Sequence, residues 1–497
     1  MTVAIPPFPA AEAERFLEAL ERECYHAGAG LTTHPELAAI YAAHPRLTDP
    51  DILAGAREEF LATGSRRAAA RLAWLVDVAV GHRTAELEAR RREWESRAVV
   101  TLPNGDRHDY HRVPVDLARI RDREHRLVLE RARTTLAAAH LGELRLEAVR
   151  REREVLESLR LGDAVRARST VSGVDLDALA AAATRFLRDT ADLYEYALGR
   201  LAKRRLDLAP GRLAPGDLPW LFASHGFDRI FDGGTLAALA RLQLGEMGLD
   251  AAAGGRIRID AAERPGKGVR AFCSPVRVPD EVYVVIRPRG GHGDLRSFWH
   301  ELGHALHRAH TPRDLPFETR RLGDPAVTEG YAHLLDRLTV EPGWLRRYLG
   351  LGAREADALI RELAVGDLFI RRRHAAKLLY ELELYRAPDR SAIRGRYGEL
   401  MSEATLARYP DDDALLDVDP GLHSARYLRG WRLEAALGAW LTGRFGDDWF
   451  RNPDAGPALA ALMARGGEPR AEELARELTG REPSFEPLVR RAESLLG

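Results

Sequence analysis

Cysteine is scarce in this sequence, whose 497 residues include only Cys24 and Cys273. Two cysteines cannot form a disulfide framework or a four-cysteine zinc site. So few cysteines are typical of proteins that work in a reducing compartment, and we therefore expect a cytoplasmic protein.

Long apolar runs are missing as well. The chain contains no stretch of about 18 uncharged apolar residues, the length that a membrane-spanning helix needs. Its first residues also lack the positively charged start and the apolar core of a signal peptide. We therefore expect no membrane partner.

An excess of charge of either sign is also absent, because 74 lysine and arginine residues balance 75 aspartate and glutamate residues. Proteins that bind nucleic acid through a basic surface usually carry a clear positive excess. We therefore expect no nucleic-acid partner. The sequence does not indicate the oligomeric state.

Apolar residues recur at helical spacing through most of the chain, which predicts a mainly helical fold. The pair Asn104-Gly105 predicts a β-hairpin near residues 98–113. Proline-glycine pairs near residue 210 predict a boundary between an N-terminal helical lobe, 1–209, and a catalytic lobe, 210–497. Three short strands are expected in the second lobe, at 256–260, 269–274 and 282–287.

The strongest chemical signal lies between Ser297 and His307. His300 and His304 are four residues apart, so on a helix both imidazoles share one face and can bind one Zn²⁺ ion. Glu301, next to the first histidine, can take a proton from metal-bound water and pass it to the leaving amine. Apolar neighbours would bury this helix, and buried helices rarely carry such groups without a function. We therefore predict a zinc site with Glu301 as general base.

A third protein ligand is needed, and two residues can supply it. His310 lies six residues after His304, as in metzincins, but the metzincin pattern requires glycine where this chain has His307. Glu329 lies 25 residues after His304, in a second apolar-flanked segment with Pro325 near its start. We favour Glu329, which completes a His₂Glu site and leaves a fourth position for water. His310 is the alternative.

Asp336 lies seven residues after Glu329, or two helical turns, so the two side chains face the same side of the second helix. It could bind the outer nitrogen of a ligand histidine and so orient that ligand. An ordinary surface aspartate is an equally good interpretation of this one residue.

The chain resembles the thimet oligopeptidase / oligoendopeptidase F family of zinc metallopeptidases, which are gluzincins. The resemblance rests on His300–His307, with its glycine and third histidine, and on the spacing to Glu329 and Asp336. Segments 266–273 and 478–483 are also similar to motifs of that family. The likeness covers the chain well from about residue 215 onward and the rest loosely.

This resemblance implies a mainly helical metallopeptidase with two lobes around a deep central channel and a small β-sheet beside the zinc helix. The channel would admit short unstructured peptides, and the strand at 282–287 would pair with the peptide backbone. The resemblance also implies that His423 and Tyr427 stabilise the oxyanion. The chain departs from the family at Gly430, where a further tyrosine is usual.

Together these observations predict a cytoplasmic peptidase that uses one Zn²⁺ ion to hydrolyse internal bonds of short peptides. The nearest alternative is a helical zinc carboxypeptidase that removes C-terminal residues. An alternative of another class is a non-catalytic, peptide-binding helical protein that retains the metal site.

Overall fold

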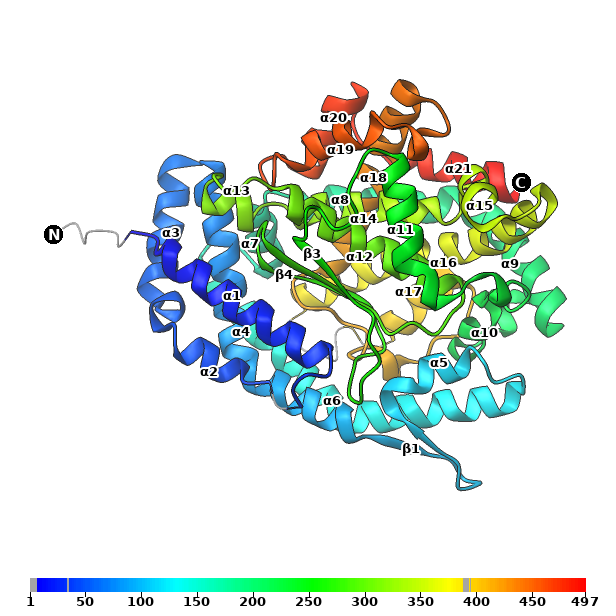
Figure 1. Cartoon of the computed structure of the whole chain (residues 1–497). Helices are drawn as coiled ribbons and strands as arrows, with labels where there is room; N and C mark the ends of the chain where they lie inside the picture. The colour runs from blue at the N-terminus through cyan, green and yellow to red at the C-terminus, as the bar shows by residue number, and fades with distance from the viewer. Residues whose placement is uncertain (1–6, 34, 388–392, 394) are drawn as a thin grey trace. The chain divides into compact units, whose positions relative to one another are not determined.

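The computed structural model describes residues 7–33, 35–387, 393 and 395–497. In this part of the chain most residues lie in helices, which are joined by a two-stranded and a three-stranded sheet (Figure 1). The prediction of a mainly helical fold with a small sheet is confirmed. No helix among the described residues is both long enough and apolar enough to cross a membrane.

The chain divides into two compact units, and each unit is assembled from three separate segments. Unit 1 contains Met1–His82, Ser224–Ile360 and Arg429–Ser484, and unit 2 contains Arg83–Ala223, Arg361–Leu428 and Phe485–Gly497. This division is not the one expected from consecutive lobes, 1–209 and 210–497, and that boundary stays a prediction.

Unit 2 holds a hairpin in which β1 (Val99–Thr101) pairs antiparallel with β2 (Arg107–Asp109), within the range 98–113. Buried apolar residues of this hairpin pack with helix α6 (Arg123–Ser158) in one hydrophobic cluster. The helices that lie wholly in unit 2 are α5 (Val113–Leu117), α6 (Arg123–Ser158), α7 (Ala164–Ser172), α8 (Leu176–Asp189), α9 (Ala191–Leu206), α10 (Leu218–Phe222), α17 (Arg396–Thr405) and α21 (Glu486–Leu496).

Unit 1 contains the three-stranded sheet and the two helices with the predicted ligands. The helices that lie wholly in unit 1 are α1 (Ala10–Gly28), α2 (Leu37–Ala42), α3 (Pro50–Thr63), α11 (Leu236–Glu246), α12 (His292–His310), α13 (Phe317–Arg321), α14 (Pro325–Leu338), α15 (Pro342–Leu349), α19 (Ala455–Met463) and α20 (Ala471–Thr479). Three helices have residues in both units: α4 (Arg66–Arg97), α16 (Ala353–Arg386) and α18 (His423–Phe445).

The sheet of unit 1 corrects one expectation. Its strands β3 (Ile257–Asp260), β4 (Phe272–Arg277) and β5 (Glu281–Val285) lie in the order β3-β5-β4. The central strand β5 pairs parallel with β3 and antiparallel with β4. The segment 282–287 was expected to pair with a peptide, but both edges of β5 are already occupied. Only β3 and β4 have an outer edge.

Helices α12 and α14 pack side by side in the core of unit 1 (Figure 1). Pro325 occupies the first turn of α14, and the carboxylate of Asp324 accepts a hydrogen bond from the Ala326 N–H at 3.0 Å. The helix therefore begins at the proline that the sequence placed near its start. On α12, Phe298 and Trp299 are fully buried. The burial of these rings orients the opposite side of α12, which carries His300 and His304.

Candidate metal centre

Gly303 allows α12 and α14 to approach closely. A Cβ atom at this position would lie 2.6 Å from the Cα of Ala332 and 2.8 Å from the carbonyl oxygen of Tyr331, so any side chain would force the helices apart. The glycine between Glu301 and His304 therefore has a packing role. It brings the histidines of α12 within reach of the carboxylates of α14.

Three predicted ligand atoms meet between these helices. The Nε2 atoms of His300 and His304 are 3.2 Å apart, and each lies 3.6 to 3.7 Å from the Oε2 atom of Glu329. Four ligands about 2.1 Å from a metal ion lie about 3.4 Å from one another in a tetrahedral site. The His₂Glu set therefore has the spacing of a metal site before any rearrangement.

The environment of Glu329 and His304 also suits a cation. The Oε2 atom of Glu329 is buried and accepts no hydrogen bond from any described residue, a costly arrangement for a carboxylate. Burial holds the pKa of His304 well below its usual range, so its imidazole is neutral and keeps a lone pair. At His300, burial is outweighed by the hydrogen bond to Asp336 and by nearby carboxylates, which raise the pKa to about 9, so this imidazole must release a proton when it binds a metal. A metal ion at this position would satisfy the carboxylate oxygen and both imidazoles.

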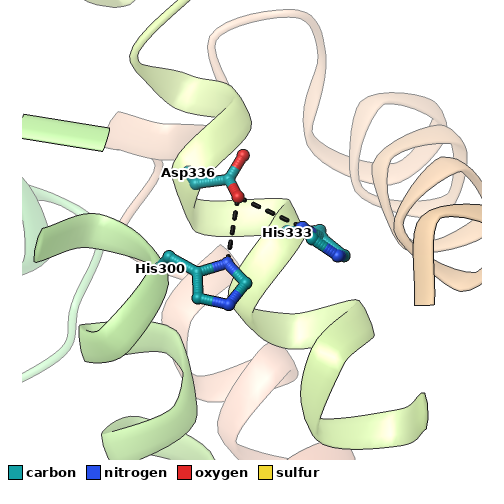
Figure 2. A group of neighbouring side chains, drawn as sticks. All are labelled: His300, His333 and Asp336. Carbon is teal, nitrogen blue, oxygen red and sulfur yellow. Dashed lines mark hydrogen bonds and ion pairs between the residues drawn. The ribbon is translucent and has the colours of Figure 1, made fainter. Parts of the chain in front are cut away.

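Asp336 orients the first of these histidines. Its Oδ2 atom lies 3.0 Å from Nδ1 of His300 on α12 and 3.1 Å from Nδ1 of His333 on α14, as Figure 2 shows. Burial raises the pKa of Asp336, but the charge of Arg296 and the hydrogen bonds from both histidines outweigh it and hold that pKa well below its usual range. The ionised carboxylate therefore accepts the Nδ1 proton of His300, which leaves Nε2 facing the site.

His304 is oriented by Thr328, whose Oγ1 atom lies 2.9 Å from His304 Nδ1. The sequence analysis missed both Thr328 and His333. A spacing signal for His333 was present, since it is four residues after Glu329 and three before Asp336 and so shares their face of α14. Thr328 carried no such signal. It lies on α14 and its partner His304 lies on α12, and helical spacing relates only residues of the same helix.

The other two histidines of α12 have structural partners. His310 Nδ1 lies 2.8 Å from the carbonyl oxygen of Leu306 in its own helix, and His310 is not in the ligand group. The metzincin alternative is therefore not supported. His307 is buried and its Nε2 lies 3.3 Å from the carbonyl oxygen of Gly466, so it ties α12 to the loop before α20.

Glu301 stands next to the ligand group and is held by the sheet. Its carboxylate accepts a hydrogen bond from the backbone N–H of Cys273 in β4. Burial raises the pKa of Glu301 to about 7, against the lowering effects of His300 and of that hydrogen bond. A carboxylate with a pKa near 7 can both take up and release a proton at neutral pH.

His423 and Tyr427 belong to unit 2, on the first turns of α18, with ring centres 5.0 Å apart. The Tyr427 ring also stacks on His374 at 5.0 Å. These contacts hold the tyrosine ring within unit 2, and the predicted role of both residues in stabilising an oxyanion stays a prediction.

Gly430 has a direct explanation in unit 1. A Cβ atom there would lie 2.6 Å from the Cβ of Glu329 and 3.3 Å from Cδ2 of His333. The backbone of α18 therefore packs directly on the helix turn that bears the Glu329 ligand, and His333 stacks on the neighbouring Trp431 with ring centres 5.0 Å apart. No tyrosine fits at position 430 in this packing.

Comparison with known proteins yields structural relatives. No protein-family model and no curated protein sequence matches the chain. The fold is similar to that of a protein provisionally assigned as an oligoendopeptidase F, with a TM-score of 0.68 and 15% identity over 99% of this chain and 96% of that one. It is also similar to a provisionally assigned peptidase from Chlamydophila abortus, with a TM-score of 0.58 and 14% identity over 97% of this chain and 89% of that one. At such identities the likeness is one of fold: the chain folds like oligoendopeptidase F, and a buried His/His/Glu group in it could hold a metal ion.

Proposed function

We propose that this protein is a zinc-dependent peptidase that hydrolyses internal bonds of short, unstructured peptides. One observation carries the proposal: His300, His304 and Glu329 direct their ligand atoms at one point, next to a glutamate with a pKa of about 7. Two imidazoles and one carboxylate form a common donor set for catalytic zinc, which keeps a position open for water or substrate.

In this proposal each residue has a defined task. A zinc ion held by His300, His304 and Glu329 would supply a Lewis acid that polarises the peptide carbonyl and acidifies a water molecule. Glu301 accepts the proton from the attacking water and returns it to the leaving amine. The Cys273 N–H holds the Glu301 carboxylate in place for both transfers. We retain His423 and Tyr427 as proposed donors to the oxyanion that develops on the carbonyl.

The outer edge of β4 is the place where we propose that a peptide backbone pairs. The Cys273 N–H points to Glu301 and so away from β5. A peptide added along this edge would pass beside Glu301 and would pair with β4 through the Cys273 carbonyl oxygen, because the Cys273 N–H is bonded to Glu301 and Pro275 has no N–H. This replaces the earlier expectation for segment 282–287, whose strand lies in the centre of the sheet.

Replacing Glu301 with glutamine tests the proposal. We expect Glu301→Gln to bind zinc like the wild type while hydrolysis of a mixed peptide pool falls by about 100- to 10,000-fold, because the base is lost and the ligands remain. Elemental analysis measures the metal, and mass spectrometry with and without chelator measures the cleavage. Glu329→Ala should lose zinc, and His310→Ala should keep it.

Three results would contradict the proposal. Full activity in Glu301→Gln would show that Glu301 is not the general base. A wild-type protein that binds zinc but cleaves no peptide would instead be the non-catalytic, peptide-binding alternative. Loss of single residues from the C-terminus, with no internal cuts, would instead identify a carboxypeptidase.

A further inference from the structure

His333 on α14 donates a hydrogen bond to the carboxylate that orients a proposed metal ligand. Its Nδ1 atom lies 3.1 Å from Oδ2 of Asp336, and the same oxygen lies 3.0 Å from Nδ1 of His300 on α12, as Figure 2 shows. Because an ionised carboxylate only accepts hydrogen bonds, each imidazole carries a proton on Nδ1. A single oxygen atom therefore links His333 to the ligand of the other helix.

The ring of His333 is fixed by contacts with α18. It stacks on Trp431 with ring centres 5.0 Å apart and an angle of 27° between the ring planes. The backbone of Gly430 comes so close that a Cβ atom there would lie 3.3 Å from Cδ2 of His333. The side chain is also buried. Its Nδ1–H group therefore keeps one direction, toward Asp336.

The other oxygen of the Asp336 carboxylate makes a longer contact. Oδ1 lies 3.5 Å from Nη2 of Arg296, whose side chain is partly exposed to solvent. A carboxylate can turn about its Cβ–Cγ bond, and the attraction of a guanidinium can draw either oxygen toward it. Two hydrogen bonds at Oδ2, one from each histidine, oppose such a turn. His333 therefore helps to keep Oδ2 directed at His300.

The side chains of His300, His333 and Asp336 also lie close enough together to hold a metal ion of their own. Such an ion would have to displace the Nδ1 protons of both imidazoles, and the ring of His300 would then bind a metal through each nitrogen. The guanidinium 3.5 Å from Asp336 Oδ1 would also repel a second cation. The arrangement therefore favours a hydrogen-bonded support for one metal ion over a second metal site.

We propose that His333 is a positioning residue, whose N–H fixes the Asp336 carboxylate and through it the direction of His300 toward the metal. Without this donor the carboxylate can turn toward Arg296, and the ring of His300 loses part of its support. Residues that hold metal ligands in this way typically contribute about 10- to 100-fold to metal affinity. This inference rests on the metal site of the proposed function, but it does not require that the protein hydrolyses peptides.

Two substitutions of His333 separate its hydrogen bond from its packing. His333→Asn places an amide N–H near the position of Nδ1 but has no ring to stack on Trp431. His333→Phe keeps an aromatic ring there but has no donor. We expect His333→Phe to weaken zinc binding by about 10- to 100-fold, and His333→Asn to stay within about threefold of the wild type. Competition with a chromophoric chelator measures the affinity, and circular dichroism verifies folding. His333→Leu replaces the phenylalanine variant if the latter does not fold.

A double-mutant cycle tests whether the effect passes through Asp336. In an Asp336→Asn background, His333→Phe should change the affinity little further, because the route to His300 is already broken. The absorption spectrum of the cobalt-loaded protein gives an independent signature, since it depends on how the ligands are arranged around the metal. His333→Phe should alter this spectrum and His333→Asn should preserve it. His310→Phe is the control and should change neither affinity nor spectrum, because His310 is not in the ligand group.

The possible results separate this inference from the proposed function. A wild type that binds zinc as expected, responds to these substitutions and cleaves no peptide supports the inference and contradicts only the peptidase function. Weaker binding in His333→Asn than in His333→Phe would show that packing, and not the hydrogen bond, matters, which overturns the inference. Wild-type affinity in His333→Phe, or an effect that persists in full in the Asp336→Asn background, also overturns it. So does a second zinc ion per chain that His333→Phe fails to bind, because the group would then be a metal site.

Discussion

The Oδ2 atom of Asp336 accepts hydrogen bonds from two histidines, and one of them is a proposed metal ligand. We predict that Asp336→Asn weakens zinc binding by about 10- to 100-fold, because the neutral amide no longer fixes the His300 tautomer or supports its basicity. Competition with a chromophoric chelator measures the change in affinity. The exposed Asp314→Asn is the control, and unchanged affinity in Asp336→Asn would show that Asp336 has no influence on the metal.

Glu381 of unit 2 has no exposed surface, and among the described residues its Oε2 atom has no hydrogen-bond partner. Burial raises the pKa of Glu381 from an ordinary 4.5 to about 8, against the opposing charge of Lys377. The folded state therefore holds this proton more tightly than the unfolded state does. Its contribution to stability is complete below pH 4.5 and is lost as the pH rises towards 8.

We predict from this sign that Glu381→Gln becomes more stable relative to the wild type between pH 4.5 and 8, and that the difference then levels off. The gain should be on the order of 2 kcal/mol at pH 9, because the variant does not have to ionise a buried carboxyl. Urea denaturation at pH 5, 7 and 9 measures it. Glu403→Gln, an exposed position of the same unit, is the matched control. A difference that shrinks as the pH rises would contradict the assignment.

Residue spacing predicted much of the candidate site. His300, His304 and Glu329 were identified because helical periodicity relates residues within one element, and the structure brings their ligand atoms together. The contact between Thr328 and His304 could not be predicted in the same way, because the two residues lie on different helices and are 24 residues apart in the sequence.

At the scale of elements, the strands were predicted near their observed positions but their order was not. Local composition identifies an extended segment, whereas its neighbours in a sheet depend on distant pairing. One clue was present in the sequence of β5, where Val282, Tyr283, Val284 and Val285 follow Glu281 without a polar break. A nearly continuous apolar strand is typical of a central position, and an edge strand more often alternates.

The contact between α14 and α18 gives a further prediction. Gly430→Ala should lower stability by about 1 to 3 kcal/mol and weaken zinc binding, because the added methyl group displaces the turn that carries Glu329. Denaturant midpoints and chelator competition measure the two effects. Gly443→Ala in the same helix meets no atom within 4 Å and should stabilise the protein by about 0.5 to 1 kcal/mol. Equal behaviour of both variants would exclude a special role for Gly430.

At the scale of the whole molecule, metal binding should appear in the thermal unfolding. When a protein binds zinc only in its folded state, zinc at 100 times its dissociation constant raises the free energy of unfolding by about 2.7 kcal/mol. We therefore expect calorimetry to show an unfolding transition whose midpoint temperature rises by a few degrees with zinc and falls with chelator. His304→Ala should abolish the zinc-dependent shift, and His310→Ala should preserve it. A shift that persists in His304→Ala would place the metal elsewhere.

The interleaved composition of unit 1 affects how the protein is made. A ribosome completes its first segment at His82 and its last at Ser484, about 400 residues later, which corresponds to about 20 to 80 s of synthesis. During that time the nascent chain carries residues such as Phe16, which are buried in the finished unit, without all of their partners. The ligands on α12 and α14 also leave the ribosome before the turn of α18 that packs on Glu329. The candidate metal centre is therefore completed only when translation is nearly finished, and until then the apolar residues around it lack their final partners.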